Sequence, residues 1–285
     1  MASDPPENDY ILHNESETTR LAFQHRVIRD AMNGRLVLAP IDLYKAPLQI
    51  LDSCTADGLW IRDLQSSLPP NIASQHAFIG TDIEESYFPT DPPGNTTYHV
   101  QDVNKPWPEQ WNEKFDLVHQ RLSIAVSGDE KATQSAVRNL ISLVKPGGWI
   151  QIVDLQNWTA DGDGPVWKDF TICLADLISA VGSSLDRVEH VKNCFEGLGL
   201  IDVEETSIEA NYGTRDDKPL EAIGKKSGLL TAQSILSVAT TFPQEILTLP
   251  KARVSDIKAG LEKEMSTDPV SAHWRYKVVW GRKPE

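Results

Sequence analysis

The sequence predicts an α/β fold with a parallel sheet that carries helices on both faces. Two observations support this. From residue 48 onward, short apolar runs typical of strands alternate with longer runs of helical periodicity. The stretch 50–60, ILDSCTADGLW, reads as a buried strand, a turn of small residues and the start of a helix. The composition, 40% hydrophobic and 24% charged residues, is ordinary for a globular protein.

The first 47 residues are predicted to form a tail followed by an N-terminal helical lid. Residues 1–9 are rich in Pro, Asp and Glu, which favours a disordered tail. Apolar residues recur at helical spacing over 15–32, and Asn33-Gly34 ends that run. Prolines at 40 and 47 then separate this segment from the sheet.

The region 48–160 is predicted to be a Rossmann-like cofactor-binding core. Its strand-like runs are 49–51, 76–80, 97–100, 115–119 and 149–154. Helical runs over 60–68 and 131–144 lie between them, and Lys145-Pro146-Gly147-Gly148 ends the second.

The region 161–285 is predicted to complete the core and to carry an inserted helical cap. Helices are expected over 166–181 and 185–198, followed by a strand over 201–210. The cap, about 211–265, includes helical runs over 229–240 and 254–265. A closing strand over 275–280 alternates in polarity.

Charge and cysteine content exclude several classes of protein. The net charge is 27 − 41 = −14, which disfavours nucleic acid as the main ligand. The three cysteines show no CxxC spacing, so we expect a reduced compartment and no metal site. No secretory signal or membrane-spanning run is visible, and a cytoplasmic protein without membrane contact is expected.

Polar residues stand at the ends of successive predicted strands. Asp52 ends the first, Asp82 the second and Asp102 the third, while His119-Gln120-Arg121 ends the fourth. Ligands of such sheets bind at the carboxyl ends of the strands, and a turn of small residues lets a ligand approach the backbone. Taken singly, each acid is also consistent with a residue that caps a turn. The turn within 50–60 is also consistent with an ordinary strand-to-helix connection.

These motifs together resemble the class I S-adenosylmethionine-dependent methyltransferases, and more narrowly the LaeA-like family of fungal secondary metabolism. The resemblance covers nearly the whole chain. It is carried by YILHNESETTRLAFQHRV near the start, ILDSCTADGLW, FIGTDI, FDLVHQR, LVKPGGWIQIVD and the closing VVWGRKP. It implies a seven-stranded Rossmann-like sheet with an N-terminal helical segment and an inserted helical cap.

The resemblance also implies a cofactor site for S-adenosylmethionine at the strand ends. The residues that would form it are Asp52, Ser53, Cys54, Gly58, Asp82, Ile83, Asp102, Val103 and Gln120. The turn and Gln120 would hold the methionine end, Asp82 the ribose and Asp102 the adenine. Where the family has three glycines, this chain has Cys54, Ala56 and Gly58. A β-carbon is costly there if the backbone needs positive φ.

The sequence also offers candidate residues for catalysis and for substrate contact. His119 is a candidate base and Arg121 a partner for an acidic substrate group, although a packed histidine and a surface ion pair are equally consistent. Five residues are candidates for substrate contact: Tyr10, His25, Trp158, Trp167 and Phe170. Tryptophans at helical spacing are also typical of a hydrophobic core.

We therefore expect a methyltransferase that acts on a nitrogen or oxygen atom of a small molecule, with a homodimer as the candidate assembly. The alternative is a catalytically degenerate regulator or interaction protein of secondary metabolism. A nicotinamide-dependent oxidoreductase is disfavoured because the glycine turn is eroded.

Overall fold

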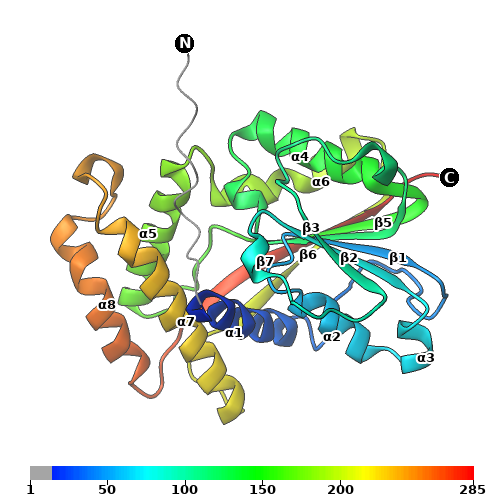
Figure 1. Ribbon diagram of the computed structural model, residues 1–285. Coiled ribbons are helices and arrows are strands. Elements are labelled where there is room, and N and C mark those ends of the chain that lie inside the picture. Colours follow the sequence, from blue (N-terminus) through cyan, green and yellow to red (C-terminus); the bar gives the residue numbers. More distant parts are fainter. Residues whose placement is uncertain (1–14) are drawn as a thin grey trace.

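The computed structural model describes residues 15–285, so the predicted tail over 1–9 and Tyr10 lie outside the described residues. A seven-stranded sheet in the order β3-β2-β1-β4-β5-β7-β6 forms the centre of the molecule (Figure 1). Its strands are β1 (Gln49–Ser53), β2 (Ala77–Asp82), β3 (Thr96–Val100), β4 (Phe115–Arg121), β5 (Val144–Leu155), β6 (Ile201–Asn211) and β7 (His273–Arg282). Each overlaps a strand that the sequence predicts.

The first five strands are parallel, so their carboxyl ends meet at one edge of the sheet. In the middle, Asp52 of β1 pairs in register with Gly80 of β2 and with His119 of β4. The alternation of strands and helices predicts a parallel sheet, but the sheet is mixed. Strand β7 runs antiparallel between β5 and β6. The chain leaves β6 at the carboxyl edge, forms helices beyond that edge, and returns from it, which reverses the direction of β7.

Helices cover both faces of the sheet. On one face lie α4 (Glu130–Leu143) and α6 (Val191–Gly197), and on the other α2 (Leu59–Ser67) with the short α3 (Pro70–Ala73) (Figure 1). Buried residues of β1 alternate between two hydrophobic cores: Ile50 packs on the side of Trp60 in α2, and Leu51 packs on the side of Val137 in α4. The alternation explains why this strand is apolar on both faces.

Four longer helices gather beyond the carboxyl edge, three of them at the left of Figure 1 and α1 nearer its centre. They are α1 (Glu15–Ala31), α5 (Pro165–Ala180), α7 (Lys218–Ala239) and α8 (Lys251–Met265). The helix expected over 185–198 divides into a 3-10 turn, η4 (Leu185–His190), and α6. Further short 3-10 turns are η1 (Glu85–Tyr87), η2 (Glu109–Trp111), η3 (Ile124–Val126) and η5 (Gln244–Ile246).

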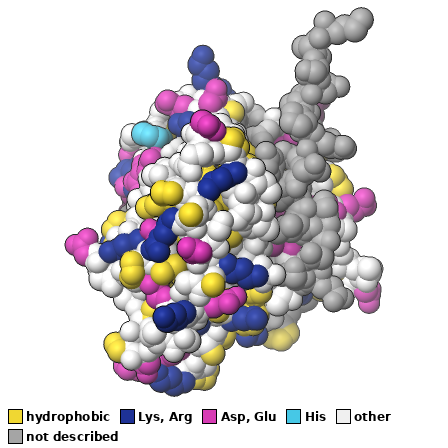
Figure 2. Space-filling model, turned by 90° about the vertical axis from the view of Figure 1, so that its left-hand side faces the viewer, with side chains coloured by type: hydrophobic (Ala, Val, Ile, Leu, Met, Phe, Trp, Pro, Cys, Tyr) yellow, Lys and Arg dark blue, Asp and Glu magenta, His cyan; other side chains and the backbone are white. Residues whose placement is uncertain are grey.

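The outer side of these helices carries interspersed basic and acidic side chains with scattered hydrophobic ones (Figure 2). Within residues 15–285, no helix is both long enough and apolar enough to span a membrane.

Candidate functional site

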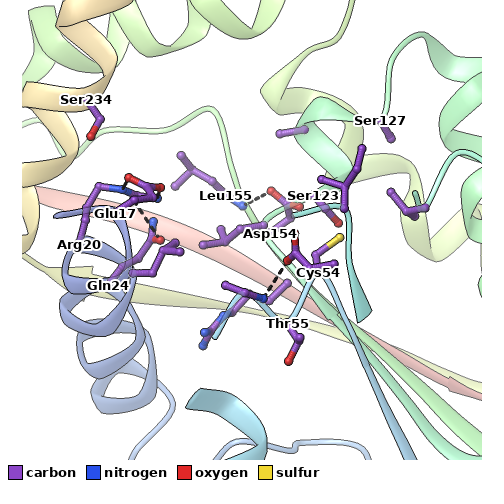
Figure 3. A pocket seen from close by; sticks show the side chains of 18 of the residues that line it. Glu17, Arg20, Gln24, Cys54, Thr55, Ser123, Ser127, Asp154, Leu155 and Ser234 are labelled. Carbon is purple, nitrogen blue, oxygen red and sulfur yellow. Dashed lines mark hydrogen bonds and ion pairs between the residues drawn. The ribbon is translucent and has the colours of Figure 1, made fainter. Parts of the chain in front are cut away.

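A cavity of about 680 Å³ separates the carboxyl edge of the sheet from helices α1, α5 and α7 (Figure 3). This volume is typical of a small-molecule site. Eight of the residues singled out from the sequence line it: His25, Asp52, Cys54, Asp82, Ile83, Asp102, Val103 and Arg121. The carboxyl ends of β1, β2, β3 and β4 therefore line the same cavity.

Asp82 joins the tip of β2 to the turn after β1. Its Oδ2 accepts the N–H of Ala56 at 2.8 Å, and its Oδ1 accepts the N–H of Glu84 at 3.2 Å. Burial raises the pKa of Asp82, opposed by these backbone donors. The carboxylate is therefore held in place with lone pairs left for a ligand, and Asp102 lines the cavity at the tip of the next strand.

The turn after β1 has left-handed backbone at every second residue. Cys54 has φ 57°, Ala56 has φ 49° and Gly58 has φ 74°. The chain thus keeps the backbone path of a glycine turn although two glycines are replaced. Gly58 does not line the cavity. It has a steric role instead, because a β-carbon there would lie 2.0 Å from Oη of Tyr98.

His119 is buried and does not line the cavity, so it is not placed to act as a base on a substrate bound there. Its Nδ1 lies 2.7 Å from Oδ1 of Asp52, and its ring stacks on Trp60 with centroids 4.0 Å apart. Burial lowers the pKa of His119 despite the neighbouring carboxylate. The other oxygen of Asp52 accepts the hydroxyl of Thr55 at 2.6 Å. Asp52 therefore fixes the turn and the β4 tip at once.

Ser53 and Gln120 also lie off the cavity. Ser53 Oγ donates to Oε1 of Gln120 at 3.0 Å, which ties the tips of β1 and β4 together. Both side chains are buried and neither lines the cavity, so the structure does not bring them together with the other residues expected to hold the cofactor.

Arg121 and His25 face the cavity as part of a hydrogen-bonded chain. Arg121 Nη2 donates to Nδ1 of His25 at 3.1 Å, and His25 Nε2 donates to Oδ2 of Asp63 at 2.8 Å. Burial, and then the charge of Arg121, lower the pKa of His25 to about 4, so its imidazole is neutral. Asp63 also accepts from Arg29 at 2.8 Å. Among residues 15–285, Arg121 forms no ion pair, and its charge is available to an anion in the cavity.

The predicted aromatic wall of the substrate site is not formed by the residues expected. Trp167 and Phe170 are fully buried and pack against Trp274, with centroids 4.7 and 5.5 Å from it. The guanidinium of Arg275 lies over the ring of Trp158, with its Cζ atom 3.7 Å from the ring centroid. Helix α5 turns its aromatic side into the core, and its aliphatic side faces the cavity: Leu174, Leu177 and Ile178, with Val181 just beyond it.

Sequence reasoning missed the acid at the tip of β5. Asp154 lines the cavity and is 1% exposed, with Oδ2 accepting the N–H of Ile124 at 2.7 Å and Oδ1 that of Leu155 at 2.8 Å. Burial raises its pKa to about 6. The rule that picked out Asp82 and Asp102, an acid at the end of a predicted strand, applies equally to Asp154.

Helix α1 contributes a polar group at the far end of the cavity. Arg20 lies 2.6 Å from Oε1 of Glu17 and donates to Oε1 of Gln24 at 3.3 Å (Figure 3). The helices add aliphatic side chains from α5 and Ile235 and Val238 from α7, together with the hydroxyls of Thr231 and Ser234, and Ser234 lies near Arg20 in Figure 3. The cavity therefore has an acidic end at the β2 and β3 tips and a mainly apolar end under the helices.

The residues present fit an adenosyl cofactor. Carboxylates at the tips of β2 and β3 match hydroxyl and amine donors, and the left-handed turn brings backbone close to the ligand. Within the described part of the chain, no group of three or more His, Cys, Asp or Glu residues is arranged to hold a metal ion.

Comparison with known proteins finds relatives along the full chain. The chain is 33% identical to N-methyltransferase sirN of Leptosphaeria maculans, covering 99% of this chain and 97% of that protein. It is also 33% identical to N-methyltransferase gliN of Aspergillus fumigatus, covering 98% of each. Methyltransferase psoC of the same fungus matches at 33% over 86% of this chain and 89% of its own. No protein-family model matches the chain.

Solved structures share the fold at low sequence identity. A chain from the complex of the Haloferax volcanii Trm112 methyltransferase activator with a methyltransferase superposes with TM-score 0.51 and 13% identity, covering 96% of this chain and 100% of that one. An O-methyltransferase family protein from Burkholderia thailandensis gives 0.50 and 12%, covering 95% of this chain and 61% of that one.

Proposed function

The chain belongs to the family of fungal methyltransferases that includes sirN and gliN, it uses S-adenosylmethionine, and we propose that its acceptor is a nitrogen atom of a compact, largely apolar small molecule. The relatives' names support nitrogen over oxygen as the acceptor atom. The aliphatic walls contributed by α5 and α7 support an apolar substrate.

One observation carries this proposal: a single cavity joins two compartments of different chemistry. Asp82 and Asp102 line the end at the β2 and β3 tips, where they would hold the ribose and the adenine. The leucines of α5 line the other end. A donor and an acceptor bound in these compartments would be neighbours, as a two-substrate transfer requires.

The cofactor, when bound, supplies a methyl group on a positively charged sulfur, and that charge disappears on transfer. The chain's own residues orient the reactants and exclude water. The turn from Cys54 to Gly58 is fixed by the hydrogen bonds of Asp52 and Asp82, and its backbone would hold the amino-acid end of the cofactor. Helices α1, α5 and α7 cover the cavity and limit water. Orientation of this kind can lower a barrier by about 7–11 kcal/mol.

Cys54 is not a nucleophile in this scheme. Burial raises the pKa of its thiol to about 12, with a further contribution from the charge of Asp82. The thiol is thus neutral and acts as a small side chain beside the turn.

The second candidate function is that of a LaeA-like regulator that does not transfer methyl groups. The replacement of two glycines by Cys54 and Ala56 favours it. The retained left-handed path of the turn favours the enzyme, because the cradle keeps its shape.

Calorimetry with S-adenosylmethionine separates these candidates, and micromolar binding is expected of the enzyme. In a second assay, methyl-labelled S-adenosylmethionine is incubated with the protein and a small-molecule extract of fungal culture. Mass spectrometry should then find label on nitrogen of a small molecule. Absence of cofactor binding would overturn the proposal and favour the non-methylating regulator. Label found only in protein would overturn the assignment of a small-molecule acceptor.

A further inference from the structure

Asp154 is an acid in the cavity that the cofactor does not account for. Asp82 and Asp102 end β2 and β3, on one side of the central strand β1, whereas Asp154 ends β5, on the other side of β1 and β4. Figure 3 shows its carboxyl group beside Ser123 and Cys54. It therefore lies between the turn that would hold the cofactor's methionine and the apolar compartment under the helices.

Its position is fixed by the backbone. Oδ2 accepts the N–H of Ile124 and Oδ1 that of Leu155, and the N–H groups of Ser123 and Ala125 also favour the charged form of the carboxylate. With one hydrogen bond at each oxygen, a lone pair remains on each. Among residues 15–285, Asp154 forms no ion pair. A carboxylate held in this way can accept a further hydrogen bond or a proton from a ligand without moving.

We propose that Asp154 contacts the acceptor nitrogen and takes up its proton during methyl transfer. This inference rests on the proposed function and names the residue that performs its proton step. The acceptor nitrogen's lone pair forms the new N–C bond, and the C–S bond breaks with its electron pair staying on sulfur. The N–H proton moves to a carboxylate oxygen of Asp154 and then to solvent.

The surrounding charges are compatible with this role. The titratable side chains on neighbouring elements include Cys54, Arg121 and Lys277 of β7, and the acids Asp52 and Asp82 line the same cavity. Cys54 is neutral, Arg121 donates to His25, and Lys277 pairs with Glu189 and Glu205. Asp52 and Asp82 are both held by hydrogen bonds of their own. The pKa of about 6 for Asp154 places it in the range where a carboxylate is both ionised and basic near neutral pH. His119, the other candidate, is buried behind Asp52 and Trp60.

The test uses two ligands that differ only near the transferred group. S-adenosylhomocysteine lacks the methyl group, and sinefungin carries a protonated amine in its place. If Asp154 faces that position, the wild-type protein should bind sinefungin at least tenfold more tightly than S-adenosylhomocysteine. In Asp154→Asn the ratio of the two dissociation constants should approach one. Equal affinities in the wild type, or a preference kept by Asp154→Asn, would overturn the inference.

Two controls separate this role from a structural one. Asp82→Asn should weaken both ligands alike and leave the ratio unchanged, since Asp82 lies at the nucleoside end. In the wild type, the preference for sinefungin should fall as pH drops through about 6, where Asp154 becomes protonated. The pH series tests the inference even if Asp154→Asn fails to fold, and a flat ratio would contradict it. Failure of both ligands to bind would overturn the proposed function itself.

Once the labelling assay has identified the acceptor, steady-state kinetics can test the proton transfer directly. Asp154→Asn should lower kcat by about 10²–10⁴-fold, with the KM for S-adenosylmethionine nearly unchanged. An unchanged kcat would show that the proton leaves by another route.

Discussion

Oδ1 of Asp52 lies 2.7 Å from Nδ1 of His119, and the two residues sit opposite each other on β1 and β4. Both residues are almost fully buried. The pair joins β1, whose turn would hold part of the cofactor, to the neighbouring strand β4. Its role is to hold the turn, and its loss should be seen first in stability.

Replacing His119 with Gln is expected to lower the free energy of unfolding by about 2–4 kcal/mol, because a buried carboxylate loses a partner and a stacked ring is removed. Urea unfolding followed by circular dichroism measures this. The affinity of the folded variant for S-adenosylhomocysteine should change little. His190→Gln, at an exposed histidine, is the matched control and should stay within about 0.5 kcal/mol. A stable but inactive His119→Gln would contradict this assignment.

Ala56→Gly and Cys54→Gly are expected to stabilise the protein by about 0.5–1 kcal/mol each. Both residues have positive φ, where a β-carbon costs about 1–2 kcal/mol, and the greater unfolded-state entropy of glycine offsets part of the gain. Thermal unfolding gives the sign. Ala259→Gly on the exposed side of α8 is the control and should destabilise by about 1 kcal/mol. If all three variants lose stability alike, the turn is not strained.

Asp82→Asn is expected to weaken binding of S-adenosylhomocysteine by about 100-fold, the effect of losing charge-assisted hydrogen bonds to a ligand worth about 1.5–3 kcal/mol. Isothermal titration calorimetry measures it directly. Asp91→Asn, at an exposed loop acid, removes the same charge and should leave the affinity unchanged. Equal effects in the two variants would indicate a loss of net charge rather than of a ligand contact.

His25 should make the protein sensitive to acid. Its pKa is about 4 in the fold against 6.5 when unfolded, so between these values the unfolded chain binds more protons. Stability is fully present above pH 6.5 and is lost as pH falls toward 4, by about 3 kcal/mol in total. The stability difference between the wild type and His25→Gln, measured by urea unfolding, should therefore shrink over this window. A constant difference would mean that His25 does not titrate as its burial implies.

The fold and the acidic end of the cavity were predictable because they depend on local pattern. Apolar runs locate the strands, and in a parallel sheet their ends meet at one edge, which placed Asp82 and Asp102 on a common cavity. Asp154 follows from the same rule. The φ values of Cys54 and Ala56 did not follow, because both residue types adopt negative φ in most settings.

The sequence by itself determined the sheet, its edge and the acids that stand there, since side-chain alternation and strand length are properties of a few neighbouring residues. Only the tertiary structure decided which side chains reach the cavity. His119 is enclosed because Trp60, from a helix 59 residues earlier in the chain, stacks on it, and Trp167 is buried because α5 meets Trp274 of the last strand. The direction that a side chain takes depends on what packs against it, and those partners are distant in sequence.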